Sequence, residues 1–370
     1  MFEVLNILYG WFKKEKVHTD TIACQFVYRL LAISLFAFAA VSQLRQFSGN
    51  QISCIESDTT LKEKIDSICL TSGTYTFPPP TEEDRNSDNI FFLKGIKADT
   101  LHFVEAYPGI RSWGREEPER IHHRNYMFVP FYFLILGFFC YIPRIFWKKV
   151  EQHQMIHWVQ DLNSPVLDMK REEKLVEVSA RNFAESKNSH KRYCIYFLFV
   201  HLLNIALMIG QLLLLYWVTG SDFYYYGLEV FMNSNIPPQD RPDGLSRNYP
   251  LVALCDVRIW SITGNIRIIS NMCFLHMNDV FQLLFGCQWW LLCLCIPIAT
   301  IAATSHLVKI VCPCLRRWEL KRNIRSSSAD AHRVIDKLNF GSSFVVYMMA
   351  KNVPAQTLDK ILSEVSYDLV

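Results

Sequence analysis

The distribution of charged and apolar positions sets apart four windows of the chain that carry almost no charge. Two windows of 29 residues, 193–221 and 280–308, contain no Asp, Glu, Lys or Arg, and a third of 19 residues lies between Arg124 and Arg144. A weaker window leaves 15 uncharged residues after Arg29. A helix of about 20 apolar residues can cross a hydrocarbon core, and these runs lack the alternation of barrel strands. The pattern therefore predicts four transmembrane helices, over residues 21–44, 125–147, 193–218 and 281–311.

The first span is the weakest of the four, because it has to include Arg29 near one end. A charge inside a span is a candidate pore-lining group. A long side chain near a helix end can also reach the polar interface, and this second interpretation is favoured. A cleaved signal peptide is disfavoured, because Glu3, Glu15 and Asp20 precede an apolar run that continues to Val41 without a small-residue cleavage site.

Basic residues gather on one side of the predicted membrane. Lysines and arginines flank the start of the first and third spans and the end of the second and fourth, whereas the stretch from Tyr193 to Asp240 has none. The positive-inside rule then places both termini and the loop 148–192 in the cytoplasm, with Arg120 and Arg124 among the few exceptions outside. The remaining segments are an N-terminal segment 1–20, outer loops 45–124 and 219–280, and a cytoplasmic tail 312–370.

Composition adds a disulfide framework and removes one class of partner. The 370-residue chain has a net charge of only +3, and without a Lys/Arg-rich stretch it gives no reason to expect nucleic acid as a partner. Of its 12 cysteines, Cys54 and Cys69 fall in the first outer loop, and Cys255 and Cys273 fall in the second. Four cysteines in oxidising space predict two disulfides, with three possible connectivities. A metal site is less favoured, because the cysteines lack the close pairing of zinc ligands.

No catalytic arrangement emerges from the sequence. Adjacent His122 and His123 are expected to be a solvated pair, and the acidic residues show no paired carboxylate geometry. The sequence therefore predicts no enzyme and no cofactor.

The first residues and the second span carry candidate mechanical features. Phe2, Leu5 and Leu8 recur at helical spacing, so residues 2–12 can form an amphipathic helix. Its apolar face can pack on the first span while Glu3 and Asn6 approach a pore mouth, or it can lie on the inner membrane leaflet. The residues alone leave these two placements open.

Two prolines fall inside the second predicted span. Pro130 and Pro143 each remove a backbone hydrogen bond and are candidate helix kinks. A static kink, tolerated by neighbouring helices, is favoured over a gating hinge.

Several segments, in order along the chain, carry a resemblance. Residues 45–54 read RQFSGNQISC, residues 104–110 read VEAYPGI, residues 141–144 read YIPR, and residues 161–166 read DLNSPV. They resemble the segments RQYIGDPIDC, EVAHPGV, YIPRYLWK and DLNSPV of the innexins, the gap-junction proteins of invertebrates. The YYQWV signature before the second span is replaced by NYMFV at 125–129. The chain is therefore similar to a divergent innexin, of an insect or virus-borne branch.

The resemblance implies an architecture and a function. The expected fold is an α-helical polytopic membrane protein with four transmembrane helices per subunit, a disulfide-stapled extracellular domain, a helical cytoplasmic domain and a ring-shaped oligomer. The implied disulfides are Cys54–Cys273 and Cys69–Cys255, and the implied place of Phe2, Glu3 and Asn6 is the pore mouth.

The implied assembly is a ring of six to eight subunits, with eight favoured, in the lipid of the plasma membrane at cell–cell junctions. Such a ring passes ions and small metabolites as a hemichannel, or docks with a second ring on an apposed cell as a gap junction. Other innexins are possible partners.

Two further interpretations compete with a self-sufficient channel. One is a four-span adhesion or scaffold protein that does not conduct, and the other is a modulatory subunit of heteromeric innexin channels. A tetraspanin-type organiser is disfavoured, because no Cys-Cys-Gly sequence is present.

Overall fold

The computed structural model describes most of the chain as a series of stretches. The described residues are 17, 19–48, 51–56, 59–78, 109–110, 120–123, 125–151, 154–159, 162, 169–219, 226–235, 249–260, 264–324 and 329–368. They fall into two compact units. One unit comprises Met1–Ala32, Phe138–Ile209 and Leu294–Val370, and the other comprises Ile33–Gly137 and Gly210–Cys293.

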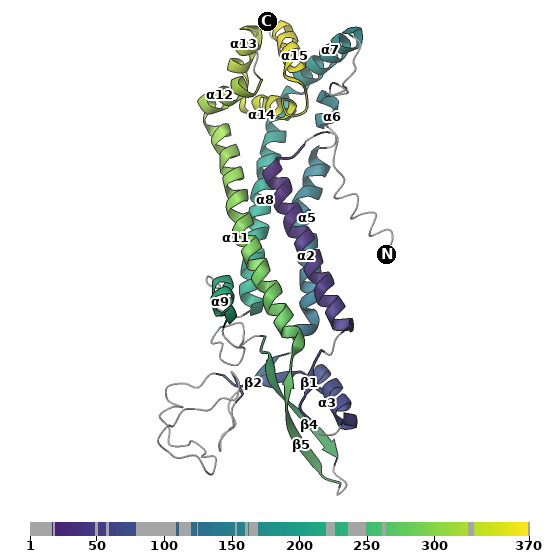
Figure 1. Ribbon diagram of the computed structural model, residues 1–370. Helices are drawn as coiled ribbons and strands as arrows, with labels where there is room; N and C mark the ends of the chain where they lie inside the picture. The colour runs from purple at the N-terminus through teal and green to yellow at the C-terminus, as the bar shows by residue number, and fades with distance from the viewer. Residues whose placement is uncertain are drawn as a thin grey trace, which may run out of the picture. The chain divides into compact units, whose positions relative to one another are not determined.

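Four long helices carry the charge-poor windows (Figure 1). They are α2 (Ile22–Ser48), α5 (Val129–Glu151), α8 (Lys187–Thr219) and α11 (His276–Val311). Each is long and apolar enough to cross a membrane, so the prediction of four membrane helices is confirmed. At about 1.5 Å per residue, the 36 residues of α11 measure about 54 Å, against about 30 Å for a hydrocarbon core. This helix therefore continues beyond the membrane.

The surface of these helices is itself apolar. Phe131, Leu213, Trp217 and Ile301 are among the large hydrophobic side chains that are more than half exposed. Such a concentration of exposed apolar residues is unusual for a soluble monomer and is typical of helices that contact lipid or other apolar surfaces.

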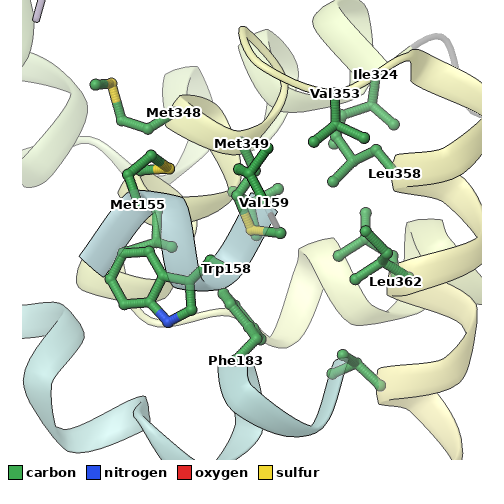
Figure 2. Packing of buried hydrophobic residues seen from close by; sticks show 14 of the residues in the cluster. Met155, Trp158, Val159, Phe183, Ile324, Met348, Met349, Val353, Leu358 and Leu362 are labelled. Atoms are coloured by element: carbon green, nitrogen blue, oxygen red, sulfur yellow. The ribbon is translucent and has the colours of Figure 1, made fainter. Parts of the chain in front are cut away.

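In the first unit, six shorter helices form a domain that we call the helical cap. They are α6 (Gln154–Val159), α7 (Met169–Glu185), α12 (Pro313–Ile324), α13 (Ala329–Lys337), α14 (Phe340–Met349) and α15 (Ala355–Asp368). Figure 2 shows its core, in which Trp158 and Phe183 from α6 and α7 pack with Met349, Leu358 and Leu362 from α14 and α15. Burying one such side chain contributes about 1.5–3 kcal/mol, so the loop between α5 and α8 and the C-terminal tail are held together as one domain.

In the second unit, the two loops that hold the four paired cysteines form a five-stranded antiparallel sheet. Its strand order is β1 (Ser53–Cys54), β5 (Ile266–Phe274), β4 (Val252–Trp260), β2 (Thr74–Thr76) and β3 (Ile121–His123). Helix α3 (Thr59–Ser72) shares a buried core with this sheet. We call these five strands and α3 the disulfide domain. A short helix, α9 (Tyr226–Met232), lies in the second of the two loops.

The two prolines of the second span occupy different places. A 3₁₀ turn, η1 (Asn125–Phe128), precedes α5, so Pro130 is in the first helical turn, where an N–H has no intrahelical acceptor. Pro143 lies inside α5, where it removes a hydrogen bond. Of the two, only Pro143 occupies a position where proline weakens an established helix.

Candidate functional site

The disulfides join the two loops of the second unit at adjacent points. Cys54 pairs with Cys273 and Cys69 pairs with Cys255, the same pairs that the resemblance implies. Cys54 and Cys273 lie directly opposite each other in the β1–β5 register, whereas Cys69 lies on α3 and Cys255 on β4. All four are buried, and the sulfur atoms of Cys54, Cys69 and Cys273 lie within 4.8 Å of one another. With each of these sulfurs in a disulfide, the group offers no thiolate to a metal ion.

A polar cluster around Asp256 joins strands β2, β4 and β5 of the same sheet. Arg120 Nη1 donates to Asp256 Oδ2 at 2.6 Å, while Tyr75 Oη and Ser270 Oγ donate to Oδ1 at 2.8 and 2.7 Å. The Arg120 guanidinium also lies over the Tyr75 ring, 4.4 Å from its centroid. Arg120, an exception to the charge asymmetry, is thus paired within the disulfide domain.

These contacts shift two pKa values in opposite directions. Partial burial raises the pKa of Asp256, but the hydrogen bonds from Ser270, Tyr75 and Arg120, together with the Arg120 charge, outweigh burial and hold this pKa below its ordinary value. Burial, followed by the hydrogen bond to Asp256 and its negative charge, raises the pKa of Tyr75 to about 12. At neutral pH the cluster therefore holds a carboxylate and a neutral phenol.

The β4–β5 hairpin carries an apolar face at its tip. Trp260 pairs with Ile266 and Arg258 pairs with Ile268, so these four side chains share one face of the two-stranded ribbon. Trp260 is 73% exposed, and Ile266 and Ile268 are 59% and 58% exposed. We call Trp260, Ile266 and Ile268 the hairpin tip face.

A second cluster holds the chain where it enters α2, and we call it the N-terminal anchor. Arg144 Nη1 donates to the carboxylate of Asp20 and, at 2.6 Å, to Tyr28 Oη. Trp147 Nε1 donates to the carbonyl of Thr19 at 3.2 Å. The Arg144 and Asp20 side chains are only 2% and 4% exposed, so this is a buried ion pair.

The sequence motif around Arg144 explains how the anchor forms. Arg144 and Trp147 are one helical turn apart on α5, so they present their side chains to the same stretch of chain. From the preceding turn, Tyr141 makes an edge contact with the Tyr28 ring at 5.9 Å. Residues 141–147 therefore contact both the segment that precedes α2, at Thr19 and Asp20, and α2 itself, at Tyr28.

The other candidate residues have separate outcomes. Phe2, Glu3 and Asn6 lie outside the described residues. The expectation of a solvated histidine pair is wrong for His123, which is buried with Nε2 2.7 Å from Thr76 Oγ1, whereas His122 is exposed. Neighbouring residues of a strand point to opposite faces, which separates the two rings.

The innexin family profile matches residues 20–369. The chain belongs to the innexin family. Innexins are gap-junction channel subunits, so the prediction of a large-pore channel subunit is confirmed by the family.

Individual innexins match along most of their length. Innexin inx2 of Drosophila melanogaster is 26% identical, and the match covers 100% of this chain and 96% of that relative. Innexin inx2 of Schistocerca americana is 25% identical over 100% of this chain and 98% of its own length. Innexin unc-9 of Caenorhabditis elegans is 23% identical over 73% of this chain and 69% of its own. This innexin is thus divergent in sequence and collinear in organisation.

One glycine of this innexin has a steric explanation. Gly341, in the Phe340-Gly341 pair that opens α14, lies so close to α8 that an added Cβ would be 2.6 Å from the Lys191 backbone nitrogen. Only glycine allows the two backbones to approach this closely. The start of α14, in the C-terminal tail, therefore packs directly against the first turns of α8.

Proposed function

We propose that this innexin assembles into a ring of six to eight subunits, with eight favoured, and that rings on apposed cells dock to form a continuous pore. The pore passes ions and small metabolites, with passage limited by its width and the charge of its lining. The hairpin tip face is the observation that carries the docking step, because it presents apolar area on a base that two disulfides hold rigid.

The proposed orientation places the disulfide domain outside the cell and both termini in the cytoplasm. Two disulfides suit an oxidising extracellular space. The helical cap contains the basic residues that follow α11, including Arg316, Arg317 and Lys321, as the positive-inside rule requires of a cytoplasmic domain. This orientation turns the hairpin tip face toward the neighbouring cell.

The N-terminal segment is proposed to line the pore mouth, with Glu3 and Asn6 toward the lumen. The N-terminal anchor supports this placement, because it fixes Thr19 and Asp20 against α5 and so gives the N-terminal segment a defined point of attachment. Deletion of residues 2–12 should change unitary conductance and gating. An unchanged single-channel record from protein at the cell surface would refute this placement.

Docking can be tested by dual voltage clamp on paired cells that express this chain alone. Trp260→Ser should abolish junctional conductance while single-membrane current persists, because it removes apolar area only from the tip. Trp318→Ser, at an exposed tryptophan of α12, is the matched control and should retain both currents. Junctional conductance that survives Trp260→Ser would contradict docking through this face. Absence of both currents in the unmodified protein, despite surface expression, would favour an adhesion protein or a modulatory subunit.

A further inference from the structure

The first unit contains a narrow cavity where the ends of α8 and α11 meet α12 and α14. It measures about 450 Å³ with its open mouth included. Because part of this space is open to solvent, the cavity can receive one end of a ligand whose remainder lies outside it. Its wall is largely apolar, with Phe197 and Leu198 from α8 and Phe344 from α14.

The charged residues of the cavity wall carry a net positive charge. Lys309, Arg316 and Glu319 contribute two cations and one anion to its wall. Lys309 Nζ donates to Glu319 Oε1 at 2.7 Å, so these two charges neutralise each other. The charge that remains is that of Arg316.

Arg316 lacks an anionic partner among the residues that the structure describes. Its Nη1 donates to the Ile310 carbonyl at 3.3 Å, but its Nε is buried without a hydrogen-bond acceptor there. Burial, together with the neighbouring charge of Arg317, lowers the pKa of Arg316. A buried donor without an acceptor carries a desolvation cost that an anion would remove.

The position of the cavity favours a ligand from the membrane. Two of its walls, from α8 and α11, are the ends of membrane helices, and the other two belong to the helical cap. Large apolar side chains exposed by roughly half or more lie on three of these helices, namely Ile195 on α8, Val311 on α11 and Leu315 on α12. A basic pocket between membrane helices on the cytoplasmic side is suited to an anionic lipid headgroup.

We propose that this cavity binds one anionic phospholipid of the inner leaflet, with its phosphate at Arg316 and the start of an acyl chain against Phe197, Leu198 and Phe344. The single net negative charge of such a headgroup matches the single cation that Glu319 does not neutralise. The lipid would join the membrane helices to the helical cap within one subunit. The choice of leaflet rests on the orientation proposed above, whereas the binding itself does not.

The proposal can be tested by native mass spectrometry of the delipidated, detergent-purified channel. Dioleoyl phosphatidylserine, dioleoyl phosphatidylcholine and oleate are added separately. Phosphatidylserine should bind more tightly than phosphatidylcholine, and Arg316→Gln should weaken phosphatidylserine binding about fivefold, the effect of about one basic contact. Arg322→Gln removes the same charge from the same helix at a residue that does not line the cavity, and it should leave binding unchanged.

A second pair of variants tests the apolar part of the site. Ser343→Leu places a larger side chain in the cavity wall and should weaken both phospholipids, with Leu198→Phe as the alternative if the first variant does not fold. Equal binding of the two phospholipids, or equal losses with Arg316→Gln and Arg322→Gln, would overturn the proposal. Arg316-dependent binding of oleate without phosphatidylserine would replace the occupant with a free fatty acid. Because the measurement needs neither docking nor conduction, its result is independent of the proposed function.

Discussion

Breaking the buried ion pair of the N-terminal anchor should lower the free energy of unfolding more when one partner is removed than when both are removed. Arg144→Met leaves the Asp20 carboxylate, 4% exposed, without its cation, and Asp20→Asn leaves the Arg144 guanidinium, 2% exposed, without its anion. Removing one partner of a buried pair typically costs about 3–5 kcal/mol, while removing both is often close to neutral. The double variant should therefore recover most of the loss, so the coupling between the two positions should exceed the loss of either single variant, about 3–5 kcal/mol.

The assay is a double-mutant cycle on the thermal or denaturant-induced unfolding of the detergent-solubilised channel. The exposed pair Arg181–Glu185, with side chains 78% and 66% exposed, provides a matched cycle in which coupling should be below about 1 kcal/mol. Additive losses for Arg144→Met and Asp20→Asn, or single losses no larger than those of the exposed pair, would refute the reasoning from burial.

Three other expectations follow from the packing. Gly341→Ala should lower the midpoint of thermal unfolding, since its Cβ would lie 2.6 Å from Lys191 N. Gly210→Ala is the control and should leave the midpoint unchanged, because its Cβ would meet no heavy atom within 4 Å. Equal midpoints for the two variants would contradict the steric explanation. Cys69→Ser should lower the free energy of unfolding of the disulfide domain by about 2–5 kcal/mol. This loss is measured as faster proteolysis of the two loops, and an unchanged rate of proteolysis would argue against a stabilising disulfide. Because Asp256 has a folded-state pKa below its unfolded value, its stabilising effect is present above pH 3.8 and is lost as pH falls through the folded pKa. Asp256→Asn should therefore narrow the stability difference between pH 7 and pH 3, which is read by acid unfolding of the disulfide domain; an unchanged difference would contradict this assignment.

The membrane helices could be predicted from sequence because the absence of charge over about 20 residues is a local signal. The sheet could not be predicted in the same way. Strands β1, β2 and β3 have only two or three residues, too few for a period of two to appear. Strand β4 did carry a usable signal, since Cys255, Val257 and Ile259 alternate with charged Asp256 and Arg258.

The anchor was missed for a different reason. Asp20 and Arg144 are 124 positions apart, and in the sequence each one reads only as a charge at the end of a span. Their pairing depends on two helices packing side by side, which no local pattern encodes. The motif at residues 141–144 pointed to the family, but only the structure connects it to the segment that precedes α2.

The cross-strand disulfide also determines how a junction would respond to tension. Cys273 belongs to β5, and only Leu275 separates β5 from the first residue of α11, while Cys54 follows α2 by a few residues. A pull on the hairpin from an apposed cell would therefore be divided at the disulfide between the first and fourth membrane helices. Because a single residue connects β5 to α11, this connection can lengthen very little under tension. The pulling force would therefore act on the membrane helices before the strands of the sheet separate.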